Sequence, residues 1–276
     1  MKNFYETKNI DFWNELARIH TQDSDYQLDT YDPKTYRLKD VETAELGDII
    51  GKKILHLQCH IGLDSFALEM MGAEVTSIDY SLDAINTATK LKRKFGLDAK
   101  FHCSNVYDLS ELKLGEFDII FTSYGVLVWL EHLDLWANTI NLHLKNEGEL
   151  IVIDEHPSAK IFSNPNQDNS AFEAKIFRFN KSYSHPIKAN FKYSYANSTH
   201  PVENQEQYIW FHSLSDIALS LTNRGMYITK FQEFNKTFYK AFSQMSLGDD
   251  GWWRFGDEYL SLPLIFLMRA KKFSKG

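Results

Sequence analysis

The sequence is poor in cysteine. Cys59 and Cys103 are the two cysteines of the 276 residues, and no C-x-x-C pair is present. So low a number excludes a scaffold held by disulfides and the common structural zinc motifs. We therefore expect reduced thiols, a cytoplasmic location and no metal site.

Long apolar runs and an excess of basic charge are also missing. No run approaches the ~20 apolar residues of a transmembrane helix, and residues 1–13 lack the apolar stretch of a signal peptide. The 30 Lys and Arg are outnumbered by 37 Asp and Glu, for a formal net charge of −7. An acidic surface repels phosphate backbones. We expect a small-molecule substrate, neither nucleic acid nor membrane as partner, and a monomer or a homodimer.

Short apolar strands alternate with helices in the middle of the chain. Strands are expected at residues 54–57, 74–78, 99–103, 117–122 and 149–153. Helices are expected at residues 64–71, 82–95 and 133–144. Such alternation predicts right-handed crossovers and a parallel, doubly wound sheet.

The flanking segments differ in character. Helices are expected at 9–20, with Asn9 or Asp11 as cap, and at 38–49; residues 158–208 are aromatic and polar, as at 177–179 and 191–195. After the cap we expect a helix capped by Ser213 or Ser215 and then strands at 227–234 and 262–269, with residues 248–253 in the loop between them. The prediction is one α/β domain, 1–276: a Rossmann-like, doubly wound, mostly parallel seven-stranded sheet. Its parts are an N-terminal helical lid (1–50), a cofactor-binding core (51–157), an inserted antiparallel β cap (158–208) and the C-terminal part of the core (209–276).

Ligands of an open parallel sheet bind beyond the carboxyl ends of its strands, where the strand order reverses. The first loop there holds Gln58, Cys59, His60 and Gly62, just before a helix N-terminus, which favours a carboxylate. An ordinary turn explains this loop equally well on its own. Asp79 favours a nucleoside, because a carboxylate after the second strand can accept hydrogen bonds from both ribose hydroxyls.

Other strand ends continue this row of candidates for cofactor binding. Tyr80 follows the second strand. Asn105 and Val106 follow the third strand and suit the polar edge and the flat face of an adenine. Ser123 and Tyr124 follow the fourth strand, where the reactive end of a nucleoside cofactor would meet its substrate. Each of these residues, taken singly, also fits an ordinary polar loop.

The arrangement resembles the class I S-adenosylmethionine (SAM)-dependent methyltransferases. It is most similar to a bacterial small-molecule subgroup whose loop reads L-H-L-Q-C-H-x-G, which is residues 55–62 here. Further matching stretches are residues 72–76 with Asp79, 117–127, 154–157, 210–214, 250–253 and 262–264. The resemblance spans nearly the whole chain, and it implies SAM as cofactor and S-adenosylhomocysteine (SAH) as product.

The cofactor loop departs from the wider superfamily, whose pattern is acid-x-G-x-G-x-G. His56 stands at the acid, and Gln58 and His60 stand at the first two glycines. The resemblance therefore implies a cofactor held by different side-chain contacts in this loop. Asn105 stands where an aspartate is common, and its side-chain oxygen can still accept a hydrogen bond from adenine N6.

Methyl transfer from a sulfonium is an in-line displacement, so the enzyme chiefly positions the acceptor and removes water. A general base helps when the acceptor is a hydroxyl or a protonated amine. Catalytic candidates are His156 beside Glu155, after the fifth strand, and His212. A strand-end cap for His156 and a helix-cap partner for His212 are the alternatives. Tyr124 is a candidate to wall the reacting methyl group.

Aromatic side chains are candidates for the remaining walls. Trp129, Trp210 and Trp252 are placed at the acceptor, and Tyr26 of the lid over the cofactor. Packing in the core or on the surface is the alternative for each. The aromatic residues of the cap favour a largely apolar or aromatic acceptor pocket. Methylation of oxygen or nitrogen is expected, and the sequence leaves sulfur and carbon open.

Three rival functions share parts of this pattern. An NAD-dependent oxidoreductase also uses an acid after a strand, but it needs G-x-G-x-x-G, and Gln58 and His60 block that close approach. An RNA methyltransferase shares the fold, and the acidic charge opposes it. A non-catalytic SAM-binding sensor or scaffold differs only in lacking turnover.

Overall fold

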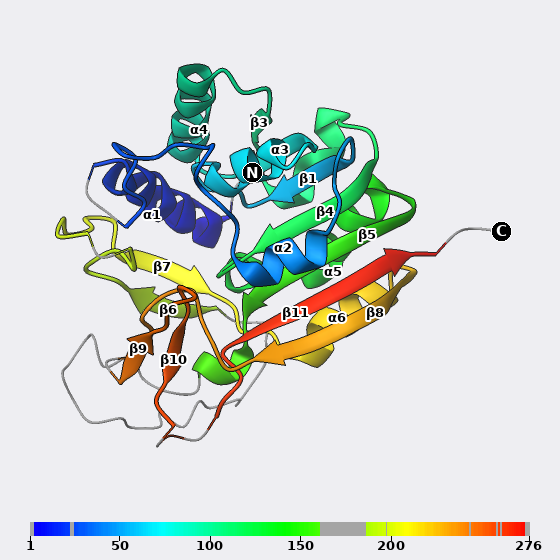
Figure 1. Ribbon diagram of the computed structural model, residues 1–276. Coiled ribbons are helices and arrows are strands. Elements are labelled where there is room, and N and C mark those ends of the chain that lie inside the picture. Colours follow the sequence, from blue (N-terminus) through cyan, green and yellow to red (C-terminus); the bar gives the residue numbers. More distant parts are fainter. Residues whose placement is uncertain are drawn as a thin grey trace.

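A seven-stranded sheet in the order β3-β2-β1-β4-β5-β11-β8 forms the centre of the protein (Figure 1). The computed structural model describes residues 3–22, 25–160, 186–196, 198–242, 244–257, 259 and 261–273. The strands are β1 (Lys53–Leu57), β2 (Glu74–Asp79), β3 (Lys100–Cys103), β4 (Phe117–Ser123), β5 (Leu144–Glu155), β8 (Met226–Phe234) and β11 (Ile265–Lys272). Strands β1 to β5 pair in parallel, and β11 runs antiparallel to β5 and β8. The predicted mostly parallel, Rossmann-like α/β fold is confirmed.

Helices cover both faces of the sheet because the strands are apolar on both sides. One face carries α2 (Asp40–Leu46), α3 (Leu63–Met70) and α4 (Leu82–Phe95); the other carries α5 (Leu133–His143) and α6 (Leu214–Thr222). Neighbouring residues of β1 show the division, since Ile54 packs in the first core and Leu55 in the second. Figure 1 shows α2 in front of the sheet and α5 and α6 behind it. None of the described helices is both long and apolar enough to cross a membrane.

Several boundaries differ from the sequence prediction. Helix α1 (Phe4–His20) begins five residues early, because Asn3 and Glu6 form a capping box that replaces the expected caps. Strand β5 begins at the very end of α5, with Glu147 turning in a left-handed conformation. The expected loop around 248–253 contains a hairpin of β9 (Met245–Leu247) and β10 (Trp253–Phe255), whose strands are too short to show a period of two.

The described part of the cap contains an antiparallel pair, β6 (Ile187–Asn190) and β7 (Glu206–Ile209). Residues 177–179 of the prediction lie outside the described residues, and residues 191–195 form bends and turns with one isolated bridge at Tyr193. Helix α1 lies along β7, as Figure 1 shows. The Asn9 side chain exchanges two hydrogen bonds of 2.7 Å with the backbone of Tyr208. The lid helix and the cap are therefore joined.

Candidate functional site

The strand order reverses between β1 and β4, so the loops after these two strands flank the expected crevice. In the loop after β1, Gln58, His60 and Gly62 have φ of 53°, 50° and 83°. A left-handed conformation costs a residue with a Cβ about 1–2 kcal/mol. Gln58 and His60 thus hold, under strain, a backbone shape that glycine adopts freely, and such strain concentrates at functional sites.

Gly62 is the one position of this loop where only glycine fits. A Cβ there would lie 2.7 Å from the ring of Phe101 and 3.1 Å from the Cβ of Ala88. Its backbone N–H donates to the Cys59 carbonyl, and its carbonyl accepts from the Phe66 N–H in the first turn of α3. The tight turn therefore sets the helix N-terminus directly behind the loop, which favours a negatively charged ligand group.

Asp79, the last residue of β2, is tied to this loop. One carboxylate oxygen accepts a 2.8 Å hydrogen bond from the His60 N–H, and the other accepts one from the Ser81 N–H at 2.8 Å. Burial raises the pKa of Asp79 to about 6, although these backbone N–H groups favour the charged form. The structure thus brings together the loop and the acid that the sequence paired.

Two polar atoms of the loop are buried without a hydrogen-bond partner among the described residues: Oε1 of Gln58 and Nδ1 of His60. The amide nitrogen of Gln58 donates to the Val126 carbonyl at 2.9 Å, which fixes the side chain across the switch point. Because an unpaired buried polar atom is costly, these two atoms are suited to a polar ligand.

The N-terminal segment, which the sequence predicts to be a lid, packs against this loop. His20, at the end of α1, meets His60 with 3.2 Å between Nδ1 and Nε2, and its other ring nitrogen lies 2.6 Å from the Ser194 hydroxyl. Tyr26 stacks on the His60 ring, with centroids 5.4 Å apart, and shares a 2.7 Å hydrogen bond with the hydroxyl of Tyr195. Burial lowers the pKa of His20 to about 2 and that of His60 to about 4, so both rings are neutral at pH 7.

The loop after β4 is shaped by Asp154. This buried β5 residue accepts hydrogen bonds from the consecutive backbone N–H groups of Gly125, Val126 and Leu127. Tyr124, just before them, has φ of 54° and packs its ring against Phe238 at 4.6 Å between centroids. The Asp154 carboxylate thus fixes the turn after Tyr124, and the Tyr124 ring packs on the face of the sheet that α2 covers.

This geometry can be compared with known proteins. Residues 50–213 match the family model described as a methyltransferase domain, which is more than half of the chain. The chain belongs to the methyltransferase domain family. No curated protein matches it.

Solved structures share the fold of this methyltransferase. An S-adenosylmethionine dependent methyltransferase from Mesorhizobium loti is 16% identical, with a TM-score of 0.56 over 84% of this chain and 96% of that one. One from Clostridium acetobutylicum is 13% identical, with a TM-score of 0.55 over 95% and 99%. The CcbJ methyltransferase from Streptomyces caelestis is 11% identical, with a TM-score of 0.60 over 97% and 99%. At these identities the likeness concerns the fold alone.

The other residues predicted to bind the cofactor lie at the ends of β1 to β4 or in the N-terminal segment. Asn105 caps the short helix η1 (Val106–Leu112), accepting from the Tyr107 N–H at 3.2 Å, and donates to Glu6 of the lid helix at 2.8 Å. Val106 and Cys59 are buried, and burial raises the pKa of the Cys59 thiol well above its usual value. The three remaining positions are Tyr80, which follows Asp79, Ser123, which ends β4, and Tyr26 of the lid.

The base candidates form a separate group. His156 lies between the Ser158 hydroxyl and the Glu233 carboxylate, each 2.7 Å from one ring nitrogen. His212 binds the Leu130 carbonyl at 2.7 Å through Nε2, and burial lowers its pKa. Among the described residues, no hydrogen bond joins either ring to the loop after β1. His156 lies at the end of β5, as its structural alternative has it, whereas His212 bonds to the Leu130 carbonyl and the cap of α6 is formed by Ser213 with Asp216. The catalytic roles of both histidines stay predictions.

A small pocket of about 20 Å³ collects further candidates beside the β4 loop. Glu155, Trp210 and His212 line it together with Leu127 and Pro157, among other residues. The indole nitrogen of Trp210 is buried with no hydrogen-bond partner in the part of the chain that the structure describes. Of the three tryptophans predicted at the acceptor, this pocket contains Trp210, beside the catalytic candidates Glu155 and His212.

Two other tryptophans are placed differently. Trp129 stacks on Phe12 of the lid helix at 6.0 Å between centroids, so it supports the lid. Trp252 is fully buried, donates to Asp40 at 2.6 Å and lies under the ammonium groups of Lys39 and Lys236, 4.9 and 4.4 Å from its centroid. Its contacts are those of a structural anchor, with the Tyr124 ring 6.2 Å away.

Sequence reasoning missed two carboxylates on the α2 face. Glu42, at 2% exposure, lies on the buried side of α2 with Val41 and Leu46, and Asp64 lies in the first turn of α3. The Tyr36 hydroxyl donates to Asp64 at 2.6 Å. The sequence signal that could have revealed Glu42 is an acidic residue beside Val41, on the side of the helix that packs against the core.

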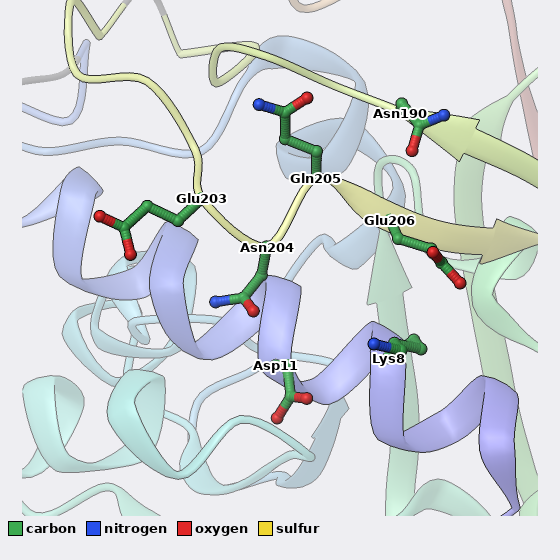
Figure 2. Close-up of a pocket in the computed structure, with 7 residues that line it drawn as sticks. All are labelled: Lys8, Asp11, Asn190, Glu203, Asn204, Gln205 and Glu206. Atoms are coloured by element: carbon green, nitrogen blue, oxygen red, sulfur yellow. The ribbon is translucent and has the colours of Figure 1, made fainter.

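A polar hollow of about 310 Å³ lies between α1 and the cap (Figure 2). Lys8 and Asp11 line it from α1, and Asn190 and residues 203–206 line it from the cap. The Glu15 carboxylate bonds the backbone N–H groups of Glu203 and Asn204 at 2.5 and 2.8 Å. The hollow therefore sits at the joint between lid and cap, apart from the strand-end loops.

Proposed function

We propose that this methyltransferase transfers a methyl group from SAM to an oxygen or nitrogen atom of a small molecule. The observation that carries the proposal is the loop after β1, with left-handed residues at positions 58, 60 and 62, fastened to Asp79. Such a loop brings backbone and polar side chains close to a ligand beside an acid suited to a ribose. SAM is its cofactor and SAH its product.

The buried polar atoms of the site fit the parts of SAM. Asp79 would bind the ribose hydroxyls, and Oε1 of Gln58 and Nδ1 of His60 would contact the amino-acid end. The α3 N-terminus behind Gly62 favours the carboxylate of that end. Asn105 and Val106 would flank the adenine.

The cofactor supplies a methyl group already activated on a sulfonium, so the protein's own part is positioning and the exclusion of water. The lid residues Trp13, His20 and Tyr26 cover the His60 ring and shield the loop. Tyr124 would face the acceptor from the α2 side, with Trp129 behind the lid and Trp252 behind Tyr124. Glu155, Trp210 and His212 line a separate hollow of about 20 Å³ on the α5 side, which would have to widen to take part.

The proposal also includes the location, the partners and the domain organisation of the enzyme. A net charge of −7 and two free cysteines support a cytoplasmic enzyme with a small-molecule substrate and no nucleic-acid partner. The chain would act as one domain, with residues 1–50 as lid, 158–208 as cap and the two core segments between and after them, in a monomer or a homodimer.

Calorimetry with SAH tests the proposal. The wild type should bind SAH and not NAD. Asp79→Asn should weaken SAH at least tenfold, because hydrogen bonds to a charged group contribute about 1.5–3 kcal/mol. Asp98→Asn, the same change at an exposed site, is the control. Binding of NAD without SAH would refute the proposal.

Turnover separates an enzyme from a SAM-binding sensor. The wild type, incubated with labelled SAM and a metabolite extract, should transfer label to a small molecule. Asp79→Asn should reduce this transfer in proportion to its loss of SAH affinity. SAH binding without any labelled product would favour the sensor.

A further inference from the structure

The small hollow on the α5 side of the sheet lies at the ends of β4 and β5. Leu127 and Val128 line it from the loop after β4, Glu155 and Pro157 from the end of β5, and residues 210–212 from the segment after the cap. Its volume is about 20 Å³, and one water molecule needs about 10–15 Å³. The hollow therefore takes one group of about the size of a water, at strand ends where this fold binds ligands.

Trp210 brings an unused hydrogen-bond donor to the wall of this hollow. The residue is 2% exposed, and its indole nitrogen has no hydrogen-bond partner among the described residues. A buried donor without a partner is costly, and a water or a ligand commonly supplies the missing acceptor. The hollow beside Trp210 is the space in which such an acceptor fits.

The wall that carries Trp210 is held against the loop after β4. The backbone N–H of Trp210 donates to the Val128 carbonyl at 2.8 Å, and Nε2 of His212 lies 2.7 Å from the Leu130 carbonyl. Because a carbonyl can only accept, Nε2 carries the proton of this imidazole. Burial lowers the pKa of His212, so the ring is neutral at pH 7. Its other nitrogen, Nδ1, is therefore a hydrogen-bond acceptor.

The groups around the hollow favour a neutral hydroxyl over other small groups. The indole N–H of Trp210 needs an acceptor atom, which an ammonium lacks. The Glu155 carboxylate repels an anion, and apolar neighbours such as Ile217 and Phe266 make a charge costly there. A hydroxyl can accept from Trp210 and also donate to Nδ1 of His212 or to Glu155, whereas a carbonyl can only accept.

We propose that this hollow binds a hydroxyl group of the methyl acceptor, with Trp210 as donor and His212 or Glu155 as acceptor. The proposal rests on the proposed function and adds a hydroxyl to the substrate class. The hollow fits the hydroxyl itself and has to widen only for the carbon that carries it. Because Tyr124 would face the acceptor from the opposite side of the sheet, we assign this hydroxyl to recognition and not to methyl transfer. A water has the same chemistry, and the experiment separates the two occupants.

Nuclear magnetic resonance of the full chain with SAH bound tests the site. The indole signal that is missing in Trp210→Phe identifies residue 210; contact with the Tyr5 ring, 6.1 Å away between centroids, identifies it independently of the variant. Benzyl alcohol, 2-phenylethanol and 3-phenylpropanol are compared with toluene, ethylbenzene and propylbenzene, which lack the hydroxyl. At least one alcohol should shift the Trp210 indole proton downfield, as a new hydrogen bond does, and its matched hydrocarbon should not.

The affinities from these titrations give a second reading. Trp210→Phe keeps an aromatic ring and removes the N–H, so it should weaken the alcohol about threefold or more relative to the matched hydrocarbon. Trp136→Phe is the matched control. Trp136 also has a buried indole nitrogen without a partner among the described residues, but it lies in the core under α5 and does not line the hollow. Its replacement should leave the ratio of the two affinities unchanged.

Three results would overturn the proposed site. The first is that no alcohol shifts the Trp210 signal more than its hydrocarbon does. The second is a nuclear Overhauser contact between the Trp210 indole proton and a water that every alcohol leaves in place, because the hollow then holds a structural water. The third is an equal change of the affinity ratio in Trp210→Phe and Trp136→Phe. SAH binding is measured in the same samples, and a wild type that binds no SAH would instead refute the proposed function itself.

Discussion

The imidazole rings of His20 and His60 meet where the lid touches the cofactor loop, with Nδ1 of His20 3.2 Å from Nε2 of His60. Only one proton can lie between two such nitrogens. Since burial lowers the pKa of both rings, the contact forms between neutral imidazoles. It joins the end of α1 to a residue whose backbone is itself left-handed.

This contact predicts a lid that opens in acid. A folded-state pKa below the usual 6.5 means that the closed form binds fewer protons than the open form. The closed lid is therefore fully favoured above pH 6.5 and loses stability as the pH falls toward 4, by up to about tenfold per pH unit for each histidine. Hydrogen exchange of residues 10–20 at pH 7.5 and pH 5 measures the change.

A matched pair of variants tests the cause. His20→Asn should make the exchange rate in α1 less dependent on pH, because one of the two titrating rings is gone. His132→Asn, at a half-exposed histidine, should keep the wild-type dependence. Equal pH dependence in all three proteins would contradict the assignment to this contact.

Glycine at position 58 should separate strain from binding. Gln58→Gly relieves a left-handed residue but loses the bond to Val126, so the free energy of unfolding should change by less than about 1 kcal/mol. SAH affinity should fall about tenfold, because the buried Oε1 is removed. Glu147→Gly relieves the same strain at another turn and should leave SAH affinity unchanged. Urea unfolding and calorimetry give the two readings; unchanged SAH affinity in Gln58→Gly would remove the side chain from the site.

Asp154 should be the most sensitive carboxylate of the fold. In the wild type, three backbone N–H groups donate to the Asp154 carboxylate. Asp154→Asn replaces one acceptor oxygen with an amide donor, and it should lower the free energy of unfolding by about 3 kcal/mol. Asp118→Asn, which touches Lys53 and Lys145 near the surface, should cost about 1 kcal/mol. Urea unfolding compares them, and a smaller loss at residue 154 than at 118 would contradict this account of the β4 loop.

Trp252 and Trp210, two of the buried tryptophans, should differ in what their replacement affects. Trp252→Phe loses the bond to Asp40 and most of the attraction of two lysines, and should cost about 2–3 kcal/mol of stability with SAH affinity retained. Trp210→Phe loses no hydrogen bond, because the indole nitrogen has no partner among the described residues. The smaller side chain should lower the free energy of unfolding by about 1 kcal/mol. Turnover, once an acceptor is known, should fall mainly in Trp210→Phe. The reverse pattern would return Trp252 to the acceptor wall.

The sheet and its helices could be predicted because their signals are local. Ile54 and Leu55 show strand β1 by their apolar character, and Ser81 and Gly96 mark the ends of α4 by capping. The start of α1 was missed because its apolar stripe is weak and the Asn3–Glu6 capping box lies before it. The β9–β10 hairpin was missed because three-residue strands carry no period.

The site could be predicted only in part. Asp79 and the 58–62 loop belong to adjacent strands, and the rule for parallel sheets brings their ends together whatever the side chains do. Glu42 and Asp64 are 22 positions apart on different helices, and their juxtaposition depends on how α2 packs. Trp252 reads as a pocket residue in the sequence, and its burial depends on Lys39 and Lys236 from separate segments.

The hydrogen bonds of Asn9 with Tyr208, and of Glu15 with residues 203 and 204, fasten the first helix to an insertion two hundred positions away. If the two segments cover the site as proposed, these bonds would make them move together. Donor and acceptor would then share an entrance, and a ligand held beneath the cover would delay the departure of whatever lies beside it.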